Sequence, residues 1–216
     1  MGSRFRLQTS PARLVGLALL AGCPNLLPGD PASQVKRAVD ELSAQGLATE
    51  VASRPLTLRK LELSEVYVDG QEPPDVLFHV QATGRWGETI VSYYGSERVS
   101  FRGAGGRWLA PAIWLPKLEG VLAALAAREA AIAAHDATAL ARLAEPDNHD
   151  GAITAPRLLE AVKAAESGTG PSPDNALSIR IDGDRAQVST LNLLPGPHAA
   201  ALVKLGDSWR FTSGLL

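Results

Sequence analysis

Cysteine is nearly absent from this chain, because Cys23 is the single one among 216 residues. A lone thiol excludes an internal disulfide framework. Long apolar runs are missing too: the apolar segment from Leu14 to Leu20 is far shorter than the ~20 residues that a membrane-spanning helix requires. That segment therefore cannot anchor the protein in a membrane by itself.

Neither sign of charge dominates the composition. The chain carries 21 Lys and Arg against 23 Asp and Glu, a formal net charge of -2, and no stretch gathers basic residues into a cluster. A mildly acidic surface repels phosphate backbones, so nucleic acid is excluded as a partner. General disorder is not expected either, since 45% hydrophobic and 20% charged residues supply an ordinary globular core.

Signatures of the common catalytic and nucleotide-binding sites are missing: GxSxG, HExxH, the Walker loop and the dinucleotide fingerprint. The glycine-rich stretch GAGG at 103–106 lies between two strand-like segments, which predicts a hairpin turn and not a phosphate loop leading into a helix. The polar loop 145–150 lacks the spacing of a calcium loop and is interpreted as solvated surface. We therefore predict no catalytic residue, no cofactor and no metal site, and expect a protein that is not an enzyme.

What the sequence does contain begins with its first 23 residues. A basic start with Arg4, Arg6 and Arg13 precedes the apolar segment, which is followed by small residues and then Cys23. This is the order of an export signal. The stretch LAGC at residues 20–23 resembles the lipobox of bacterial lipoproteins. Residues 1–22 are accordingly expected to be a lipoprotein signal peptide.

The lipobox resemblance implies cleavage between Gly22 and Cys23 and transfer of a diacylglyceryl group to the Cys23 thiol. Two or three acyl chains together, at ~0.8 kcal/mol per buried methylene, make a lasting anchor. Pro24 follows the cysteine, whereas Asp there favours inner-membrane retention in enterobacterial lipoproteins, so the resemblance implies the outer membrane. The alternative is that a general signal peptidase cuts nearby and releases a soluble secreted or periplasmic protein.

The remainder of the chain predicts two α+β units. Residues 23–32, rich in Pro, Gly and Asp, are expected to be a lipidated tether. In residues 33–113 a helix, with Asp30 as N-cap and Gly46 at its end, precedes hairpin-linked strands between Leu56 and Leu109. In residues 117–216 an alanine-rich helix over 118–132, a short helix capped by Asp136 and a third from Thr154 precede an antiparallel meander over 177–211.

The second unit, through the stretch REAAIAAHDATALARLAEPDN before its strands, resembles the nuclear-transport-factor-2-like and cystatin-like superfold. The first unit resembles a shorter, cystatin-like version. The resemblance implies helices packed into the concave side of a curved antiparallel sheet, with a cone between them. It supplies no residue-level motif, and the interruption NLLPGPHAA between two strands departs from it.

Three residues are candidates for a pocket: Trp114, Trp209 and His79. Tryptophan can line a ligand pocket, although packing in the core or at a sheet edge is its more common use. His79 shares a strand face with Leu77 and Gln81, where a general base is conceivable and a partly exposed strand histidine is the favoured interpretation.

Two functional hypotheses follow. The first is a membrane-anchored lipoprotein whose α+β domains form a non-catalytic interaction or assembly module for another protein of the cell envelope. The alternative is that the cone of the second unit binds a small apolar molecule or converts it by acid/base chemistry. The first is favoured, because no convergent polar groups that would mark a pocket can be identified in the sequence.

Overall fold

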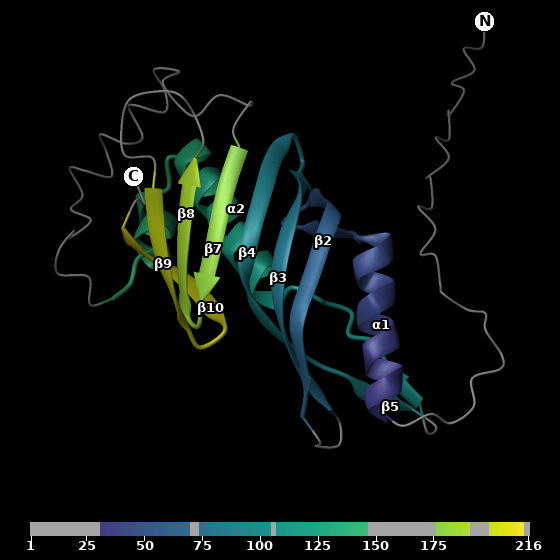
Figure 1. Cartoon of the computed structure of the whole chain (residues 1–216). Coiled ribbons are helices and arrows are strands. Elements are labelled where there is room, and N and C mark those ends of the chain that lie inside the picture. Colours follow the sequence, from purple (N-terminus) through teal and green to yellow (C-terminus); the bar gives the residue numbers. More distant parts are fainter. Residues whose placement is uncertain (1–30, 70–73, 105–106, 147–175, 191–198, 214–216) are drawn as a thin grey trace, which may run out of the picture.

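One eight-stranded sheet runs through both halves of the chain (Figure 1). The computed structural model describes residues 31–69, 74–104, 107–146, 176–190 and 199–213. In spatial order the strands are β1 (Leu47–Val51), β2 (Arg54–Val68), β3 (Asp75–Trp86), β4 (Thr89–Ser100), β7 (Ala176–Asp182), β8 (Arg185–Thr190), β9 (Ala199–Leu205) and β10 (Ser208–Ser213). The predicted α+β class, with a mostly antiparallel sheet, is confirmed.

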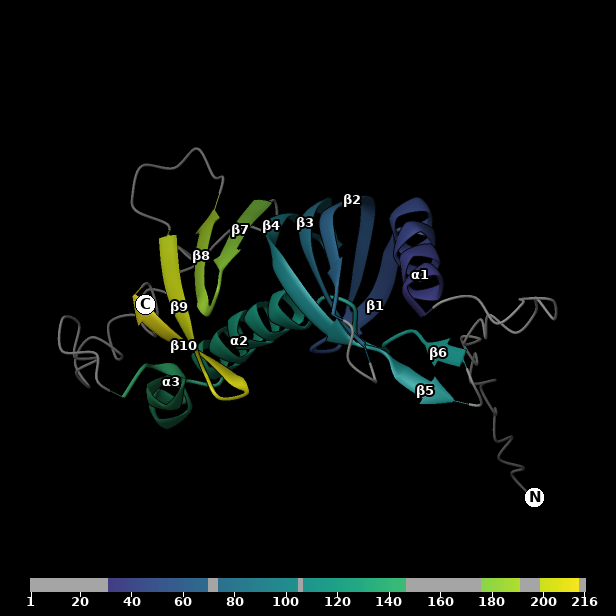
Figure 2. The same cartoon turned by 60° about the horizontal axis from the view of Figure 1, so that its bottom comes forward.

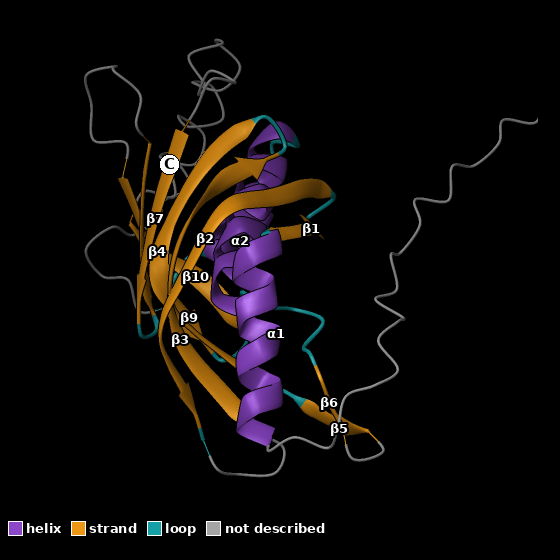
Figure 3. Cartoon of the chain, turned by 45° about the vertical axis from the view of Figure 1, so that its right-hand side comes forward, coloured by secondary structure: helices purple, strands orange, loops and turns teal. Residues whose placement is uncertain are grey.

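Three helices and a small hairpin complete the described structure. They are α1 (Pro31–Gln45), α2 (Pro116–Ala133), α3 (Ala137–Leu143), β5 (Arg102–Ala104) and β6 (Arg107–Leu109). Both long helices lie on the same side of the curved sheet (Figure 3). Helix α1 packs on β2, and α2 crosses below the sheet to contact β4, β7 and β10 (Figure 2). The other side of the sheet carries no helix among the described residues.

Most predicted elements occur where the hydrophobic pattern placed them. Gly46 ends α1 with a φ of 74°. The Asp136 carboxylate accepts a hydrogen bond from the Ala139 amide at 2.9 Å and caps α3. Strand β2 carries two bulges, between Leu58 and Lys60 and between Ser64 and Tyr67. At each bulge the pairing register with β3 shifts. The predicted lipobox, residues 23–30 of the predicted tether and the helix from Thr154 lie outside the described residues, whereas the last two tether residues, Pro31 and Ala32, belong to α1.

Strand β1 was not predicted. It is five residues long and joins β2 through a two-residue turn in which Ala52 and Ser53 both have positive φ. Such turns normally carry Asn or Gly, so the sequence holds none of the usual turn signals at this point. A side chain from β3 nevertheless stabilises this turn, because the Trp86 indole donates a hydrogen bond to the Val51 carbonyl at 3.0 Å.

The two halves meet at a parallel strand pair. Strand β4 pairs with β7 from Ile90 opposite Ala176 to Gly95 opposite Ile181, and every other pair in the large sheet is antiparallel. The expected antiparallel meander of the second half is present as β7 to β10. Strand β4 belongs to the first predicted unit and β7 to the second, so the described core is shared between them.

Glu97 joins the sheet to α2. It is 0% exposed and is the one charged side chain buried among the described residues. Its Oε1 accepts hydrogen bonds from the Tyr93 hydroxyl at 2.8 Å and the Leu118 amide at 3.0 Å, and its Oε2 accepts one from the Lys117 amide at 3.0 Å. The N-cap residue of α2, Leu115, has no side-chain acceptor. Glu97 therefore caps, from a neighbouring strand, a helix that cannot cap itself.

The residues around Glu97 leave room for its tyrosine partner and shift the pKa values of the nearby acidic groups. Tyr93 reaches it across Gly95, where a Cβ would lie 2.7 Å from the tyrosine hydroxyl, so only glycine leaves room. Burial raises the pKa of Tyr93, which keeps the phenol protonated as a donor. Burial also raises the pKa of Glu97, against the opposing effect of the two α2 amides. Burial and then the Glu97 charge raise the pKa of Glu119, on the first turn of α2, to about 7.

Replacing Glu97 with Ala should destabilise the protein by about 3 kcal/mol, because two amides of α2 lose their acceptor and a cavity remains. Tyr93→Phe should cost about 1 kcal/mol, since one donor to the carboxylate is lost. Urea unfolding at pH 7 measures both. Glu62→Ala, on the exposed side of β2, is the matched control. An equal effect of Glu97→Ala and Glu62→Ala would contradict the capping role.

Candidate functional site

The candidate site is the side of the sheet that no described helix covers, here called the open face. Side chains alternate across β3 and β4, so that Phe78, Val80 and Val91 are buried beneath the helices while their neighbours point to the open face. In Figure 1 this face of β4, β7 and β8 is toward the viewer and α2 lies behind it. Three arrangements of polar and aromatic groups occupy it.

The first arrangement is a row of hydrogen bonds across three strands. Ser96 on β4 and His79 on β3 are directly paired, and the Ser96 Oγ lies 3.0 Å from His79 Nδ1. On the other side of the ring, His79 Nε2 lies 3.0 Å from the Glu65 carboxylate. Glu65 sits in the β2 bulge with a φ of 50°, an uncommon conformation for a non-glycine residue that brings its side chain to the histidine. A neutral ring with its proton on Nε2 satisfies both contacts.

The row has the order of a nucleophile, a base and an orienting carboxylate. An acyl-transfer site also needs donors aimed at the oxyanion. Ser96 lies inside the paired register of β3 and β4, where main-chain amides donate to neighbouring strands and do not converge above the hydroxyl. The His79 and Glu65 side chains are 39% and 76% exposed, so water is not kept out. We interpret the row as a cross-strand clasp.

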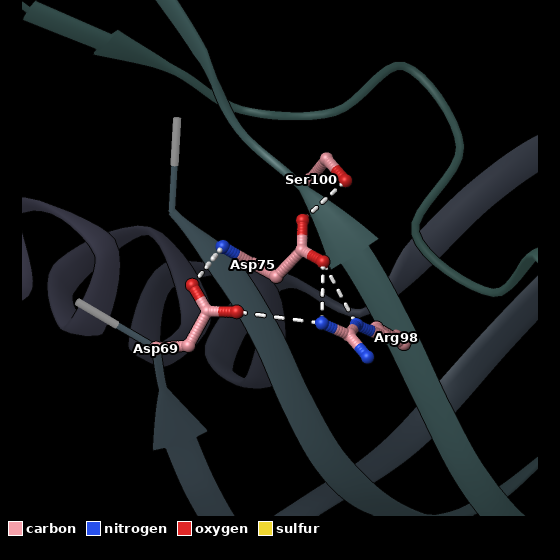
Figure 4. Close-up of polar contacts among 4 residues, drawn as sticks. All are labelled: Asp69, Asp75, Arg98 and Ser100. Atoms are coloured by element: carbon pink, nitrogen blue, oxygen red, sulfur yellow. Dashed lines mark hydrogen bonds and ion pairs between the residues drawn. The ribbon is translucent and has the colours of Figure 1, made fainter. Parts of the chain in front are cut away.

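The second arrangement fastens the end of the β2–β3 hairpin (Figure 4). The Arg98 guanidinium lies 2.8 Å from the Asp75 carboxylate and 3.3 Å from that of Asp69. Asp69 accepts a hydrogen bond from the Asp75 amide at 3.0 Å, and the Ser100 hydroxyl donates to Asp75. The Ser100 hydroxyl and, after it, the Arg98 guanidinium lower the pKa of Asp75 despite its partial desolvation. Next to this cluster, Tyr67 and Leu77 are paired in register and are 64% and 43% exposed.

The third arrangement is a shallow groove over the β4–β7 seam, with a volume of about 530 Å³. Its side chains form two rows across β3, β4 and β7, namely Gln81, Tyr94, Arg180 and Thr83, Ser92, Ser178. The Arg180 guanidinium carbon lies 5.6 Å from the centroid of the Tyr94 ring, in cation–π range. The groove therefore combines hydroxyl and amide groups with apolar surface, one exposed aromatic ring and one cation.

The structure does not bring the three predicted pocket residues together. His79 lies half-exposed on the open face. Trp209 is buried on the opposite face against Gly120, where a Cβ would lie 2.7 Å from its ring. Trp114 packs edge-on against Phe101 with ring centroids 5.7 Å apart. The predicted lipidation and cleavage residues, Cys23 and Gly22, are outside the described residues.

Sequence reasoning missed Glu97, although two signals were available. Glu97 falls at an apolar position of the alternation Val91, Tyr93, Gly95, Glu97, Val99, and α2 begins with Leu-Pro and no capping side chain. The partners of His79 were also missed. Glu65 and Ser96 become its neighbours only through the β2 bulge and the β3–β4 register, which periodicity does not reveal.

No protein-family model, curated protein or solved structure matches this chain. None of the helices in the described segments has the length and hydropathy to cross a bilayer. Within the same segments, no group of three His, Cys, Asp or Glu side chains is arranged to hold a metal ion.

If the Ser96–His79–Glu65 row is a clasp, the full-length protein should not react with a fluorophosphonate probe, which labels activated serines. Labelling is read by intact-protein mass spectrometry. Ser96→Ala should then change only stability, by about 1 kcal/mol for the lost hydrogen bond. Labelling that disappears in Ser96→Ala and in His79→Ala would contradict this interpretation and identify an activated serine.

The Asp75 cluster should give acid-sensitive stability. A carboxylate whose folded-state pKa is lowered stabilises the fold above its ordinary pKa near 3.9, and that contribution is lost as the pH falls through the lower folded value. Asp75→Asn should therefore cost at most about 1 kcal/mol at pH 7 and progressively less toward pH 3. Urea unfolding at several pH values measures this, with Asp207→Asn in the β9–β10 turn as the control. A cost independent of pH would show that the carboxylate charge is not what holds the hairpin.

Proposed function

We propose that this protein is a lipid-anchored lipoprotein of the bacterial cell envelope, a non-catalytic module that docks another envelope protein on its open face. The LAGC stretch ending in Cys23 supports the anchor, and Pro24 after it, in place of Asp, supports the outer membrane as its place. The single observation that carries the docking role is the pair Tyr67 and Leu77, exposed together beside the Arg98 cluster.

The chemistry of this docking patch, defined as Tyr67, Leu77 and Arg98, favours a protein. Tyrosine and arginine are enriched among residues that dominate binding energy, and apolar anchors ringed by polar groups are the usual anatomy of an interface. The carboxylates of Asp69 and Asp75 flank the patch. They would repel the anionic headgroups of a lipid surface, which makes a protein surface the better occupant.

The finer fold interpretation is part of this proposal. The packing of α1 with β1 to β4, and of α2 with β7 to β10, is a helix on antiparallel strands and supports the proposed cystatin-like and nuclear-transport-factor-2-like plan. In the second unit, Leu202, Trp209 and Phe211 are buried in one cluster with Leu118 and Leu122 of α2. This packing supports a structural use of that face and leaves the open face for binding, in preference to a small apolar ligand between helix and sheet.

The test places a photoreactive benzoylphenylalanine at Tyr67 of the full-length chain in a bacterial host. We expect one discrete adduct with another envelope protein. Leu77→Ser should reduce the adduct at least about fivefold, since one buried anchor is worth about 1 kcal/mol or more. Leu205→Ser is the matched control, because Leu205 is also 43% exposed but lies at the β9–β10 turn.

Cys23→Ser should remove the protein from the membrane fraction, abolish labelling by palmitate and lower the adduct.

Three results would overturn the docking role. They are an adduct only with a second copy of this chain, an adduct that Leu77→Ser and Leu205→Ser reduce equally, and no adduct at all. The captured protein must also bind the purified full-length chain, and Leu77→Ser must weaken that binding. Palmitate labelling that persists in Cys23→Ser would overturn the proposed anchor separately.

A further inference from the structure

The groove over the β4–β7 seam is not used by the docking patch. Its lowest part is a row of short hydroxyl side chains, Thr83, Ser92 and Ser178, which are neighbours in register on β3, β4 and β7. One step along the strands, the longer side chains Gln81, Tyr94 and Arg180 form the adjacent row. Three small residues therefore lie next to three large ones at the junction of the two halves.

The position of the groove argues against an extended peptide as its occupant. Ala82, Tyr93 and Ile179 also border it, and their side chains are buried on the opposite face, so they offer main chain to the groove floor. Those main-chain groups belong to central strands that are paired on both sides. A peptide cannot add to them as a new strand, which is how extended segments usually gain affinity on a sheet.

The side chains suit a sugar chain instead. Hydroxyl and amide groups both donate and accept hydrogen bonds, as the many hydroxyls of a glycan require. The Tyr94 ring is 50% exposed, and the apolar C–H face of a sugar ring packs on such an aromatic surface. Arg180 is the one charged side chain among the residues that border the groove, and its planar fork matches a carboxylate.

We propose that this groove binds an extended glycan that carries carboxylate groups. One sugar ring stacks on Tyr94, its carboxylate pairs with Arg180, and neighbouring hydroxyls bond to Gln81, Thr83, Ser92 and Ser178. A volume of about 530 Å³ is within the usual range for ligand sites of about 300–1,000 Å³. The proposal does not depend on the docking patch, because none of the groove residues belongs to it.

The experiment measures binding of three probes to the full-length protein, purified in a detergent without a sugar headgroup, by isothermal titration calorimetry. The probes are tetragalacturonate, which is acidic, maltotetraose, which is neutral, and tetraglutamate, which is an acidic peptide. Tetragalacturonate should bind at least about tenfold more tightly than either of the others, because only it offers both the sugar face and the carboxylate.

The variants separate the two contacts. Tyr94→Ala and Arg180→Gln should each weaken tetragalacturonate binding about tenfold, whereas Tyr94→Phe keeps the ring and should retain most of the affinity. Tyr67→Ala and Arg185→Gln, which lie on the open face outside the groove, are the matched controls and should have no effect. Circular dichroism establishes that each variant is folded.

Each other outcome would overturn the proposal. Equal binding of tetraglutamate would assign the groove to acidic peptides, and equal binding of maltotetraose would remove the role of Arg180. No binding at millimolar tetragalacturonate, or equal losses in Tyr94→Ala and Tyr67→Ala, would show that the groove is not a glycan site. These results leave the crosslinking test at Tyr67 unaffected, so the two proposals fail independently.

Discussion

The contact on which this fold depends is the buried carboxylate of Glu97 at the start of α2. A charged group at 0% exposure is costly, and it persists here because three donors point at its two oxygens. Two of the donors are amides at the positive end of a helix, where an anion is favourable. The contact fixes where α2 crosses the sheet, and α2 in turn covers β4, β7 and β10. One residue thus ties the last strand of the first half to the helix that organises the second.

The same arrangement explains why, in the described part of the chain, no helix covers the open face. Helices α1 and α2 both pack on the Glu97 side, so the core, the aromatic residues Trp86 and Phe211, and most of the burial are concentrated there. The opposite face keeps hydroxyl, amide, charged and scattered apolar side chains. It is held in shape by cross-strand contacts, including the Ser96–His79–Glu65 row and the Asp75–Arg98 pair. A rigid surface of this kind is available for binding at no cost to the core.

How much of this could be predicted from sequence depends on whether the information is local. Val76, Phe78, Val80 and Ala82 alternate because one side of β3 is buried, and that pattern alone placed the strand. The helix cap at Asp136 was equally local. The parallel pairing of β4 with β7 joins residues more than 80 positions apart in the chain, from Ile90 to Ala176, and leaves no periodic trace. The groove follows from this distant pairing, whereas the Glu97 cap and the His79 partners follow from contacts between neighbouring elements. None of these contacts is visible in the local hydrophobic pattern, so most of the candidate site could not be predicted from the sequence.

The geometry also constrains where a partner could lie if Cys23 carries the anchor. Pro31, the first residue of α1, lies eight residue steps after Cys23, and a fully extended chain of eight steps spans at most about 29 Å. Helix α1 begins at the end of the molecule to which the β2–β3 hairpin points (Figures 1 and 3). Tyr67 and Leu77 lie near that hairpin end, whereas the seam groove lies farther along the strands. A lipid anchor would therefore attach at the end of the molecule that carries the docking patch, and the groove would lie farther from the anchor along the same face of the sheet.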